Sequence, residues 1–592
     1  MRSGTMYAYR LSKLTFNDET ELRPGKLTIV CGPNNVGKSR ILKEIAVISS
    51  SSDPPPTVLV RDVKHVLPDS LDELRQAYSF HRYFEDRGWR GRCLAPNLCS
   101  EWSFSGGGAW PDHYAGLISR RDQNRERTFA SNFGSDLLAH LTTEHRLQLV
   151  KESPSASHEQ EVSNMLQALY EGGARAEKLV RDEVERAFAL QVALDFSAPR
   201  TLVLRVGADF SKLPPDPREA KPVLMRHEKL DDQGDGLRAF VGIIVAILAV
   251  NRGVFLIDEP ETFLHPPQAF RIGQFLANHA DESRQLVVAT HSVDFLRGVL
   301  NQTRDVTVIR VDRTDDQNSF LRLEPTTLER MATDPLLSSA RVLDGLFYTG
   351  ALVVEADRDA RFYQAVFKKR FPDVDLHFVN ADNKQTVSKI IRLYRDLVVR
   401  CSGIVDFDVL NDARDFESML DGLAMDEPNK RAALALRGNI GAEAKEVPAE
   451  ERFAAATSKI EVLSAEARAC AANLKDDLAP FLSALDAKCR DIAEAAKGWR
   501  ELKQKGICAL SESAQAEFWK LYDLCTQVGL MITPTGELES MLIDYAIERT
   551  TDKRGWISRA LKLIPGLELD DAKNPWKFAV SVHDTLRVNK TA

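Results

Sequence analysis

The chain has 592 residues, of which 44% are hydrophobic and 28% are charged, an ordinary balance for globular domains with sizeable cores. Its formal net charge of −8 excludes a protein that binds nucleic acid through overall basic charge, so DNA would need a local basic groove. Eight cysteines without a Cys-x-x-Cys pair argue against a zinc site or a disulfide framework and favour a cytoplasmic location.

The N-terminal part predicts a sheet that opens with two strands and a phosphate loop. Residues 6–16 and 26–30 have strand character, and the charged, alternating N-terminus is unlike a secretion signal. GPNNVGKS, residues 32–39, then fits the phosphate-loop pattern, in which backbone N–H groups and a lysine bind phosphates and a serine binds Mg²⁺. We expect ATP to be bound by Gly32, Asn34, Asn35, Gly37, Lys38 and Ser39, with Ser39 also a metal ligand.

Further along, residues 76–199 are irregular and mostly helical in pattern, and we interpret them as an insertion. Buried strands are expected at 201–206, 254–258, 285–290 and 306–311. The apolar run 241–250 is flanked by arginines and is too short to cross a membrane, so we expect a buried helix there.

Polar groups at the ends of two of these strands are the predicted partners of the phosphate loop. Asp258 ends an apolar run and is placed to hold the Mg²⁺ of ATP. Glu259 follows it and is placed to orient or deprotonate the attacking water. His291 follows the strand 285–290 and is expected to sense the γ-phosphate.

A second alternation of strands and helices begins near residue 350. Strands are expected at 351–355, 374–379 and 402–406, and helices at 358–370 and 385–399. This rhythm predicts a second parallel sheet. Residues 413–528 are rich in Ala, Glu and Lys with helical spacing, which indicates a helical insertion, and strand character returns at 530–542.

Acidic residues gather at the predicted tips of this second sheet. Glu355 and Asp406 each end a strand, Asp408 follows two residues later, and Asp359 lies one turn into the next helix. Because parallel strands present their carboxyl ends at one edge, these side chains are expected to share a cleft. Hard carboxylate oxygens suit Mg²⁺ or Mn²⁺. Asp357 is expected only to favour the N-terminus of its helix.

Two resemblances follow from these motifs. DEPETFLHP, residues 258–266, resembles the ABC-type ATPases of the recombination and repair class, which hydrolyse ATP between two heads that cap each other's nucleotide with a signature segment. Residues 231–240, DDQGDGLRAF, resemble that segment, and Gly234 and Gly236 are its nucleotide-facing glycines. Asp232 stands where a serine is usual. The paired heads imply a homodimer or higher homo-oligomer, with 76–199 as a candidate dimerisation segment.

The second half resembles a Toprim domain, the metal-binding fold of topoisomerases, primases and some nucleases. Ala356 replaces the usual glycine after the strand-tip Glu355, and Asn383-Lys384 replaces Gly-Lys. An ABC-type head followed by Toprim resembles the OLD (overcoming lysogenization defect) family of ATP-dependent nucleases, which includes the Gabija nuclease. The resemblance covers about 1–75 and 200–410 and a short C-terminal match, TGELESML.

The OLD resemblance implies further site residues and partners. Glu539 is the implied late metal ligand, with Glu537 the second choice, and a catalytic lysine follows. Lys562 is our choice for that lysine, with Lys553 and Lys573 left open. The family implies antiphage defence against DNA, with a partner such as a helicase or a reverse transcriptase.

The expected protein is thus an α/β chain in two parts. The ABC-type ATPase head comprises 1–75 and 200–335, and the Toprim domain comprises 345–412 and 529–592. The expected activity is cleavage of DNA by divalent ions held by Glu355, Asp359, Asp406, Asp408 and Glu539, under the control of ATP. The alternative is a nucleotide-switched scaffold or a DNA-repair ATPase whose Toprim domain does not cut.

Overall fold

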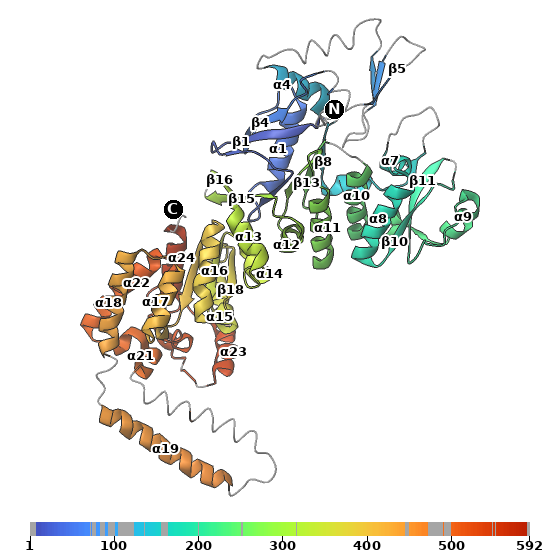
Figure 1. Cartoon of the computed structure of the whole chain (residues 1–592). Helices are drawn as coiled ribbons and strands as arrows, with labels where there is room; N and C mark the ends of the chain where they lie inside the picture. The colour runs from blue at the N-terminus through green and yellow to red at the C-terminus, as the bar shows by residue number, and fades with distance from the viewer. Residues whose placement is uncertain are drawn as a thin grey trace. The chain divides into compact units, whose positions relative to one another are not determined.

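The computed structural model divides the chain into two compact units, residues 1–347 and 348–592 (Figure 1). It describes residues 7–70, 73, 79–82, 89–92, 101–104, 124–134, 137–155, 164–198, 200–249, 253–314, 317–443, 449–471, 489, 499–547, 549–550 and 552–588. Within these residues, no helix is both long enough and apolar enough to cross a membrane.

A six-stranded sheet organises the first unit. Its order is β16 (Gln317–Arg322), β15 (Thr307–Thr314), β3 (Leu27–Cys31), β14 (Arg284–Ala289), β13 (Gly253–Asp258) and β8 (Leu138–Leu141). Only β16 runs antiparallel to its neighbour. β3 and β14 are buried along their whole length, as strands of a sheet covered on both faces are.

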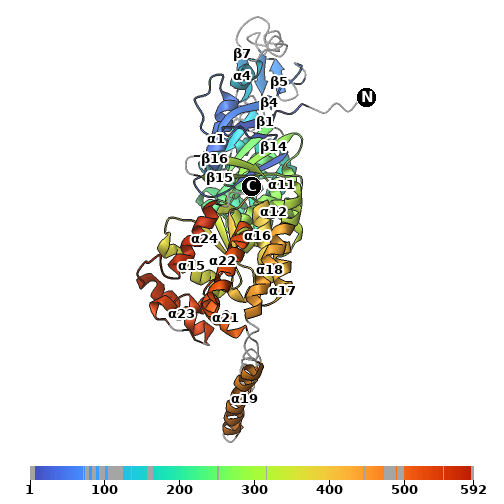
Figure 2. The same ribbon diagram turned by 90° about the vertical axis from the view of Figure 1, so that its left-hand side faces the viewer.

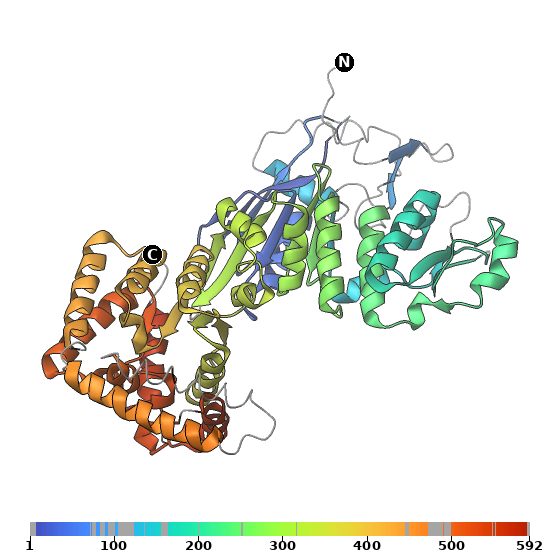
Figure 3. The same cartoon turned by 60° about the horizontal axis from the view of Figure 1, so that its bottom comes forward.

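Helices after the strands cover this sheet. α1 (Lys38–Ser50) follows β3, α11 (Pro266–His279) follows β13 and α12 (Val293–Gln302) follows β14. The green pair α11 and α12 packs side by side (Figure 3). The close approach requires glycine, because a Cβ on Gly298 would lie 2.1 Å from the Phe270 carbonyl oxygen.

A smaller antiparallel sheet shares the core of the first unit. It consists of β2 (Glu21–Leu22), β1 (Arg10–Phe16) and β4 (Val60–Val66). Phe16 of β1 stacks on Phe320 of β16 with ring centroids 4.0 Å apart, which ties the two sheets together. The strand expected at 6–16 is therefore present from Arg10, and residues 1–6 lie outside the described residues.

The described part of the segment 76–199 contains strands as well as the expected helices. They are β5 (Ser79–Arg82), β6 (Trp89–Arg92), β7 (Glu101–Phe104), β8, β9 (Ser153–Pro154) and β10 (Gln191–Asp195), with α4 (Asn124–Phe129), η1 (Ala130–Gly134), α6 (Thr143–Gln148), α7 (Met165–Glu171) and α8 (Gly173–Phe188). β8 pairs with β13, so part of this segment completes the main sheet. A four-residue strand is too short to show a period in sequence.

The remaining elements of the first unit include a buried helix, α10. They are β11 (Thr201–Gly207), α9 (Pro217–Leu224), β12 (Glu228–Lys229), η2 (Leu230–Asp232), α10 (Asp235–Ala249), α13 (Pro325–Thr333), α14 (Ala340–Leu343) and η3 (Asp344–Phe347). Residues 239–247 of α10 are all buried, and α10 packs against α6, α7 and α8. The buried helix expected at 241–250 is confirmed as far as Ala249, and residue 250 lies outside the described residues.

The second unit is built on a four-stranded parallel sheet. Its order is β18 (Leu376–Asn380), β17 (Gly350–Val354), β19 (Cys401–Val405) and β20 (Leu530–Ile532). α15 (Asp357–Arg370) follows β17 and α16 (Lys384–Asp396) follows β18. The second βαβαβ alternation read from the sequence is confirmed, with each strand within two residues of its expected start.

Helices also form the stretch directly after β19, the described part of the segment 413–528 and the C-terminal end. They are η4 (Phe407–Leu410), α17 (Ala413–Gly422), α18 (Glu427–Glu443), α19 (Ala449–Ala471), α21 (Arg500–Lys505), η5 (Gly506–Ala509), α22 (Glu512–Gln527), η6 (Leu538–Ser540), η7 (Ile543–Tyr545), α23 (Lys553–Leu563), η8 (Ile564–Gly566) and α24 (Trp576–Val588). α18 and α22 lie side by side (Figure 2). Most of residues 472–498 lie outside the described residues.

Candidate functional sites

The phosphate loop is formed around Lys38. Its Nζ donates hydrogen bonds to the carbonyl oxygens of Gly32 (2.9 Å) and Pro33 (2.8 Å), and burial lowers its pKa. Lys38 is only 6% exposed. Gly32 (φ +142°) and Gly37 (φ +94°) have positive φ values, and a Cβ on Gly32 would lie 2.2 Å from the Val311 carbonyl oxygen. The lysine is thus held inside the loop that phosphate would occupy.

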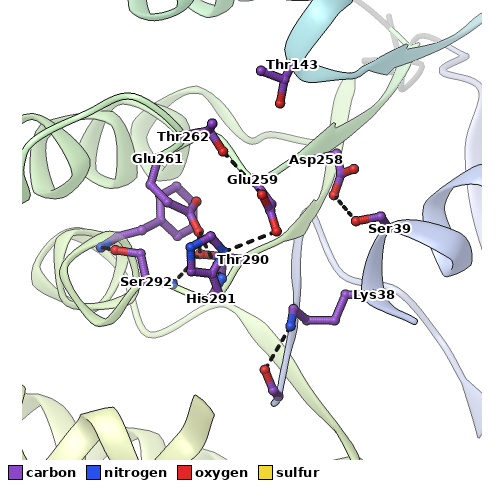
Figure 4. Close-up of polar contacts among 12 residues, drawn as sticks. Lys38, Ser39, Thr143, Asp258, Glu259, Glu261, Thr262, Thr290, His291 and Ser292 are labelled. Atoms are coloured by element: carbon purple, nitrogen blue, oxygen red, sulfur yellow. Dashed lines mark hydrogen bonds and ion pairs between the residues drawn. The ribbon is translucent and has the colours of Figure 1, made fainter. Parts of the chain in front are cut away.

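The start of α1 is open to an anion. No side chain caps its N-terminus, so its first N–H groups are available to phosphate oxygens. Ser39 lies in this first turn, and its Oγ donates to Oδ1 of Asp258 at 2.9 Å (Figure 4). β13 is separated from β3 by β14 alone, which brings the predicted Mg²⁺ ligands Ser39 and Asp258 together. Burial raises the pKa of Asp258, and a bound cation would restore its charge.

Glu259, Glu261 and His291 form a linked set at the same edge (Figure 4). Nδ1 of His291 lies 3.2 Å from Oε1 of Glu259. This hydrogen bond lowers the pKa of Glu259 and raises that of His291. Glu259 has a left-handed backbone (φ 46°), which is uncommon for a residue other than glycine and often marks a functional position. Both residues predicted to act on the γ-phosphate region are therefore brought together.

Glu261 and Arg146 support this set, and our sequence reasoning missed both. Oε1 of Glu261 accepts hydrogen bonds from Thr290 Oγ1 (2.7 Å) and from the backbone N of His291 (2.9 Å). Arg146 is fully buried and donates to the carbonyl oxygens of Asp258 (2.6 Å) and Glu259 (3.1 Å). Glu261 is part of the quoted acidic motif, whereas nothing in the local sequence marks Arg146 in α6.

The two glycines of the signature-like segment have different surroundings. A Cβ on Gly236 would lie 2.6 Å from the carbonyl oxygen of Phe263, so glycine is needed for a close approach within the chain. Gly234 has no atom within 4 Å of the place of a Cβ, and it is exposed. Asp232, also exposed, ends η2. An open Gly234 leaves room for an approaching nucleotide, and its predicted contact stays a prediction.

In the second unit, the predicted carboxylates follow three neighbouring strands. Glu355 follows β17, Asp406 follows β19, and Glu537 and Glu539 follow β20. Because these strands are parallel, the acids share one edge of the sheet. The backbone N of Asp406 donates to Oε1 of Glu355 at 3.2 Å. Asp359 is buried, and its Oδ2 accepts a hydrogen bond from the N of Ala356 at the start of α15.

Burial and mutual repulsion change the protonation of this cluster. Burial raises the pKa of Glu355 to about 7, and the negative charge of Asp408 adds to the shift. Burial also raises the pKa of Asp406 well above its usual range, with further contributions from Glu355, Asp359 and Asp408. A divalent cation nearby would favour the ionised forms. The site therefore has the electrostatic character of a cation-binding site.

Basic side chains contact the outer acids of the cluster. Lys384 donates to Oδ1 of Asp408, and Nζ of Lys503 lies 3.1 Å from its Oδ2. Burial alone would raise the pKa of Asp408, but these two lysines outweigh it and lower that pKa. Lys503 belongs to α21, within the segment 413–528, and also lies 3.5 Å from Oε1 of Glu537. Sequence reasoning missed Lys503, because helical spacing does not show which lysine reaches a distant site.

The surroundings of the C-terminal acids distinguish the three candidate lysines, Lys553, Lys562 and Lys573. Nζ of Lys553 lies 3.3 Å from Oε1 of Glu537 and 3.8 Å from Oε1 of Glu539, whereas Lys562 is exposed near the end of α23. Of the two lysines of α23, Lys553 is thus the one that contacts these acids, and the identity of the catalytic lysine stays a prediction. Lys573 pairs instead with Asp570 at 3.4 Å.

Glu539 is the strongest single indication of a cation ligand. It is 1% exposed, and neither carboxylate oxygen has a hydrogen-bond partner. Burying such oxygens without compensation is costly, so Glu539 fits a cation ligand. However, in the described part of the chain no three His, Cys, Asp or Glu side chains are grouped so that they could hold a metal ion. The predicted metal ligands thus lie at one edge of the sheet, but among the described residues no three of them are close enough together to hold one ion.

Comparisons with known proteins support the first site. Residues 113–297 match the family described as "AAA domain, putative AbiEii toxin, Type IV TA system". A search of curated proteins finds no match. Together with the phosphate loop and its partners, the family match identifies an ATPase domain of the AAA/ABC type in the first unit.

Solved structures of Smc head domains are also similar to this chain. One, from Pyrococcus furiosus and bound to the C-terminal domain of ScpA, is 11% identical over 55% of this chain and 98% of that chain, with a TM-score of 0.32. Another, from Thermotoga maritima, is 13% identical over 53% of this chain and 99% of that chain, with a TM-score of 0.27. At such scores the likeness carries no inference about activity.

The His291–Glu259 pair predicts that ATP affinity depends on pH. The raised pKa of His291 keeps it protonated at a higher pH than an ordinary histidine, so its positive charge attracts the γ-phosphate at low pH and is lost as the pH rises through that pKa. ATP affinity should therefore fall with rising pH in the wild type. In His291→Gln this part of the pH profile should be absent, as measured by titration with a fluorescent ATP analogue. If ATP affinity depends on pH in the same way in the wild type and in His291→Gln, His291 does not contact the γ-phosphate as proposed.

Proposed function

We propose that this protein is an ATP-regulated, Mg²⁺- or Mn²⁺-dependent DNA endonuclease, in which the ATPase domain controls a Toprim-type nuclease site in the second unit. The observation that carries the proposal is Glu539, a buried carboxylate beside the acids of a parallel sheet. Neither of its oxygens accepts a hydrogen bond, and its ion pair with Lys553 is long, at 3.8 Å. Carboxylate oxygens are typical ligands of divalent cations such as Mg²⁺.

Five residues would hold the divalent ions: Glu355, Asp359, Asp406, Asp408 and Glu539. When bound, such ions activate a water molecule and stabilise the leaving oxygen of a phosphodiester. Before an ion binds, burial raises the pKa of Glu355 to about 7. A bound divalent ion would favour its ionised form, so Glu355 would act as a ligand.

The lysines beside the acids give this edge of the sheet positive charge that could attract DNA. Lys384, Lys503 and Lys553 bring positive charge to a chain whose net charge is −8. They would attract the phosphate backbone of DNA once divalent ions neutralise the acids. Lys553, beside Glu537 and Glu539, is the candidate to contact the scissile phosphate in place of Lys562.

The ATPase domain is proposed to act as a gate. Pairing of two heads around ATP would place the open Gly234 of one protomer against the nucleotide of another, so a homodimer or higher homo-oligomer is the proposed assembly. The family resemblance extends the proposal to antiphage defence in the cytoplasm, with a helicase or a reverse transcriptase as a candidate partner.

One observation favours a second candidate, a nucleotide-switched scaffold or DNA-repair ATPase that does not cut. The lysines already neutralise Asp408 and Glu537, and no complete metal-holding group is present among the described residues. In a scaffold these ion pairs would be permanent. Incubation of the purified protein with supercoiled and linear DNA, with Mg²⁺ or Mn²⁺ and with or without ATP, separates the two. If the DNA stays intact under every condition, the nuclease proposal is wrong and the non-cutting scaffold or repair ATPase is the remaining candidate.

A lysine substitution tests whether the ion pairs give way to a cation. If a divalent ion displaces Lys503 from Asp408, Lys503→Ala removes a competing charge and Mn²⁺ should bind several-fold more tightly in calorimetry. Lys505→Ala is the matched control, because Lys505 is on the same helix and pairs with Glu501. Weaker Mn²⁺ binding by Lys503→Ala than by Lys505→Ala would contradict displacement.

A further inference from the structure

A partly open pocket lies in the second unit beside the loop that carries Glu537 and Glu539. Its volume is about 220 Å³. The walls come from η5, α22, the loop after β20 and α24. The lining residues are Ile507, Cys508, Trp519, Tyr522, Pro534, Thr535, Asn574, Lys577, Phe578 and Ser581. None of these residues belongs to the two sites described above.

The lining combines flat apolar surfaces with a few polar groups. Trp519 is 39% exposed, an unusual exposure for so large a ring, and it packs edge-on against Tyr522 with centroids 5.3 Å apart. Thr535 Oγ1 is buried and has no hydrogen-bond partner. Tyr522 Oη and Ser581 Oγ lie 3.1 Å apart and share a hydrogen bond. Such a pocket suits a planar ring whose edge carries hydrogen-bonding groups.

Size and charge narrow the class of ligand. The volume is below the range of about 300–1,000 Å³ that is typical for drug-sized ligands, so the pocket would hold one heterocyclic base, with any attached sugar and phosphate at its open side. Lys577 is exposed at the pocket, and among the described residues no ion pair involves its ammonium group. It is placed to contact an anion attached to the ring. We propose that the pocket binds a nucleotide, with the base against Trp519 and the phosphate at Lys577.

Hydrogen bonds link the neighbourhood of the pocket to the loop that carries Glu537 and Glu539. The backbone N of Ile507 donates to the carbonyl oxygen of Pro534 at 2.9 Å, and Ser540 Oγ donates to the carbonyl oxygen of Gln504 at 2.7 Å. A base in the pocket would therefore contact the residues that position Glu537 and Glu539. The choice of a nucleotide over another heterocycle rests on the proposed action on DNA. The nucleotide is either free or part of a DNA strand.

A binding experiment on the full chain tests this inference without any cleavage. Cys508 lines the pocket and is exposed, and Cys489 is an exposed cysteine that does not line it. Alkylation of both thiols is followed by mass spectrometry in Lys38→Ala protein, so that the ATPase site does not contribute, with EDTA present. The probes are dAMP and a single-stranded DNA of about eight nucleotides. Saturating probe should slow alkylation of Cys508 and leave Cys489 unchanged.

Variants identify the pocket as the cause of protection. Trp519→Ala should raise the probe concentration needed for half-maximal protection by about tenfold. Ser581→Phe should remove the protection, because the larger side chain fills the pocket. Lys577→Ala should weaken it, whereas Lys520→Ala, an exposed lysine of α22, should not. Protection by dAMP indicates a free nucleotide, and protection by the oligonucleotide alone indicates a strand.

Two results would overturn the inference: no protection of Cys508 by either probe, or protection that survives both Trp519→Ala and Ser581→Phe. Cleavage is not needed for any of these measurements. Protection of Cys508 in a protein that fails to cut DNA would therefore keep the nucleotide pocket and remove only the nuclease.

Discussion

Asp406→Asn is expected to lower metal-dependent DNA cleavage by at least about 100-fold, since even residues that only support metal ligands cost about 10–100-fold when replaced. Asp406 lies at the tip of β19, where its backbone N contacts Glu355. Asparagine has nearly the same shape but cannot supply a negative charge to a cation. The measurement is the rate of conversion of supercoiled plasmid to nicked and linear forms with Mg²⁺ or Mn²⁺.

The same variant should fold at least as well as the wild type. The raised pKa of Asp406 means that the folded protein favours the protonated carboxyl, so ionisation costs stability and this cost grows as the pH rises. An asparagine removes that cost. Asp373→Asn is the matched control, because Asp373 is exposed before β18, at the opposite end of the strands. Equal cleavage by Asp406→Asn and Asp373→Asn would remove the nuclease assignment.

Lys38→Ala is expected to weaken ATP binding by about 100-fold or more, because charged hydrogen bonds to phosphate contribute roughly 1.5–3 kcal/mol each. Lys38 is held in the loop by two carbonyl groups, Gly32 and Pro33, so its ammonium is positioned before the nucleotide arrives. Equilibrium titration with a fluorescent ATP analogue measures the change.

The control for this variant lies on the same helix. Lys43 is exposed on α1, and Lys43→Ala should bind ATP as the wild type does. Unchanged affinity in Lys38→Ala, with the same thermal stability as Lys43→Ala, would contradict the phosphate-loop interpretation.

The sequence predicts the strands and their site residues well where a local pattern exists. β13, β14, β17 and β19 are short apolar runs that end at a polar residue, and each was expected within about two residues. Asp258, His291, Glu355 and Asp406 follow from those ends, because parallel strands present their carboxyl ends at one edge. The order of the strands within each sheet does not follow from the local pattern and comes from the structure.

Residues that reach a site from elsewhere could not be predicted in this way. Arg146 contacts Asp258 and Glu259 from a short helix in a segment without a clear period. Lys503 contacts Asp408 from a helical segment whose lysines all look alike in sequence. Lys553 and Lys562 are on the same helix, and only the direction of α23 distinguishes them. Tertiary packing, not local pattern, decides such contacts.

The most direct test of the central claim is to measure Mn²⁺ bound to the full chain without nucleotide, by electron paramagnetic resonance in the Lys38→Ala background. Carboxylates from β17, β19 and the loop after β20 should bind Mn²⁺, and Asp406→Asn and Glu539→Gln should each weaken that binding strongly. Absence of bound Mn²⁺, or binding that neither substitution changes, would contradict a divalent-cation site at this sheet edge.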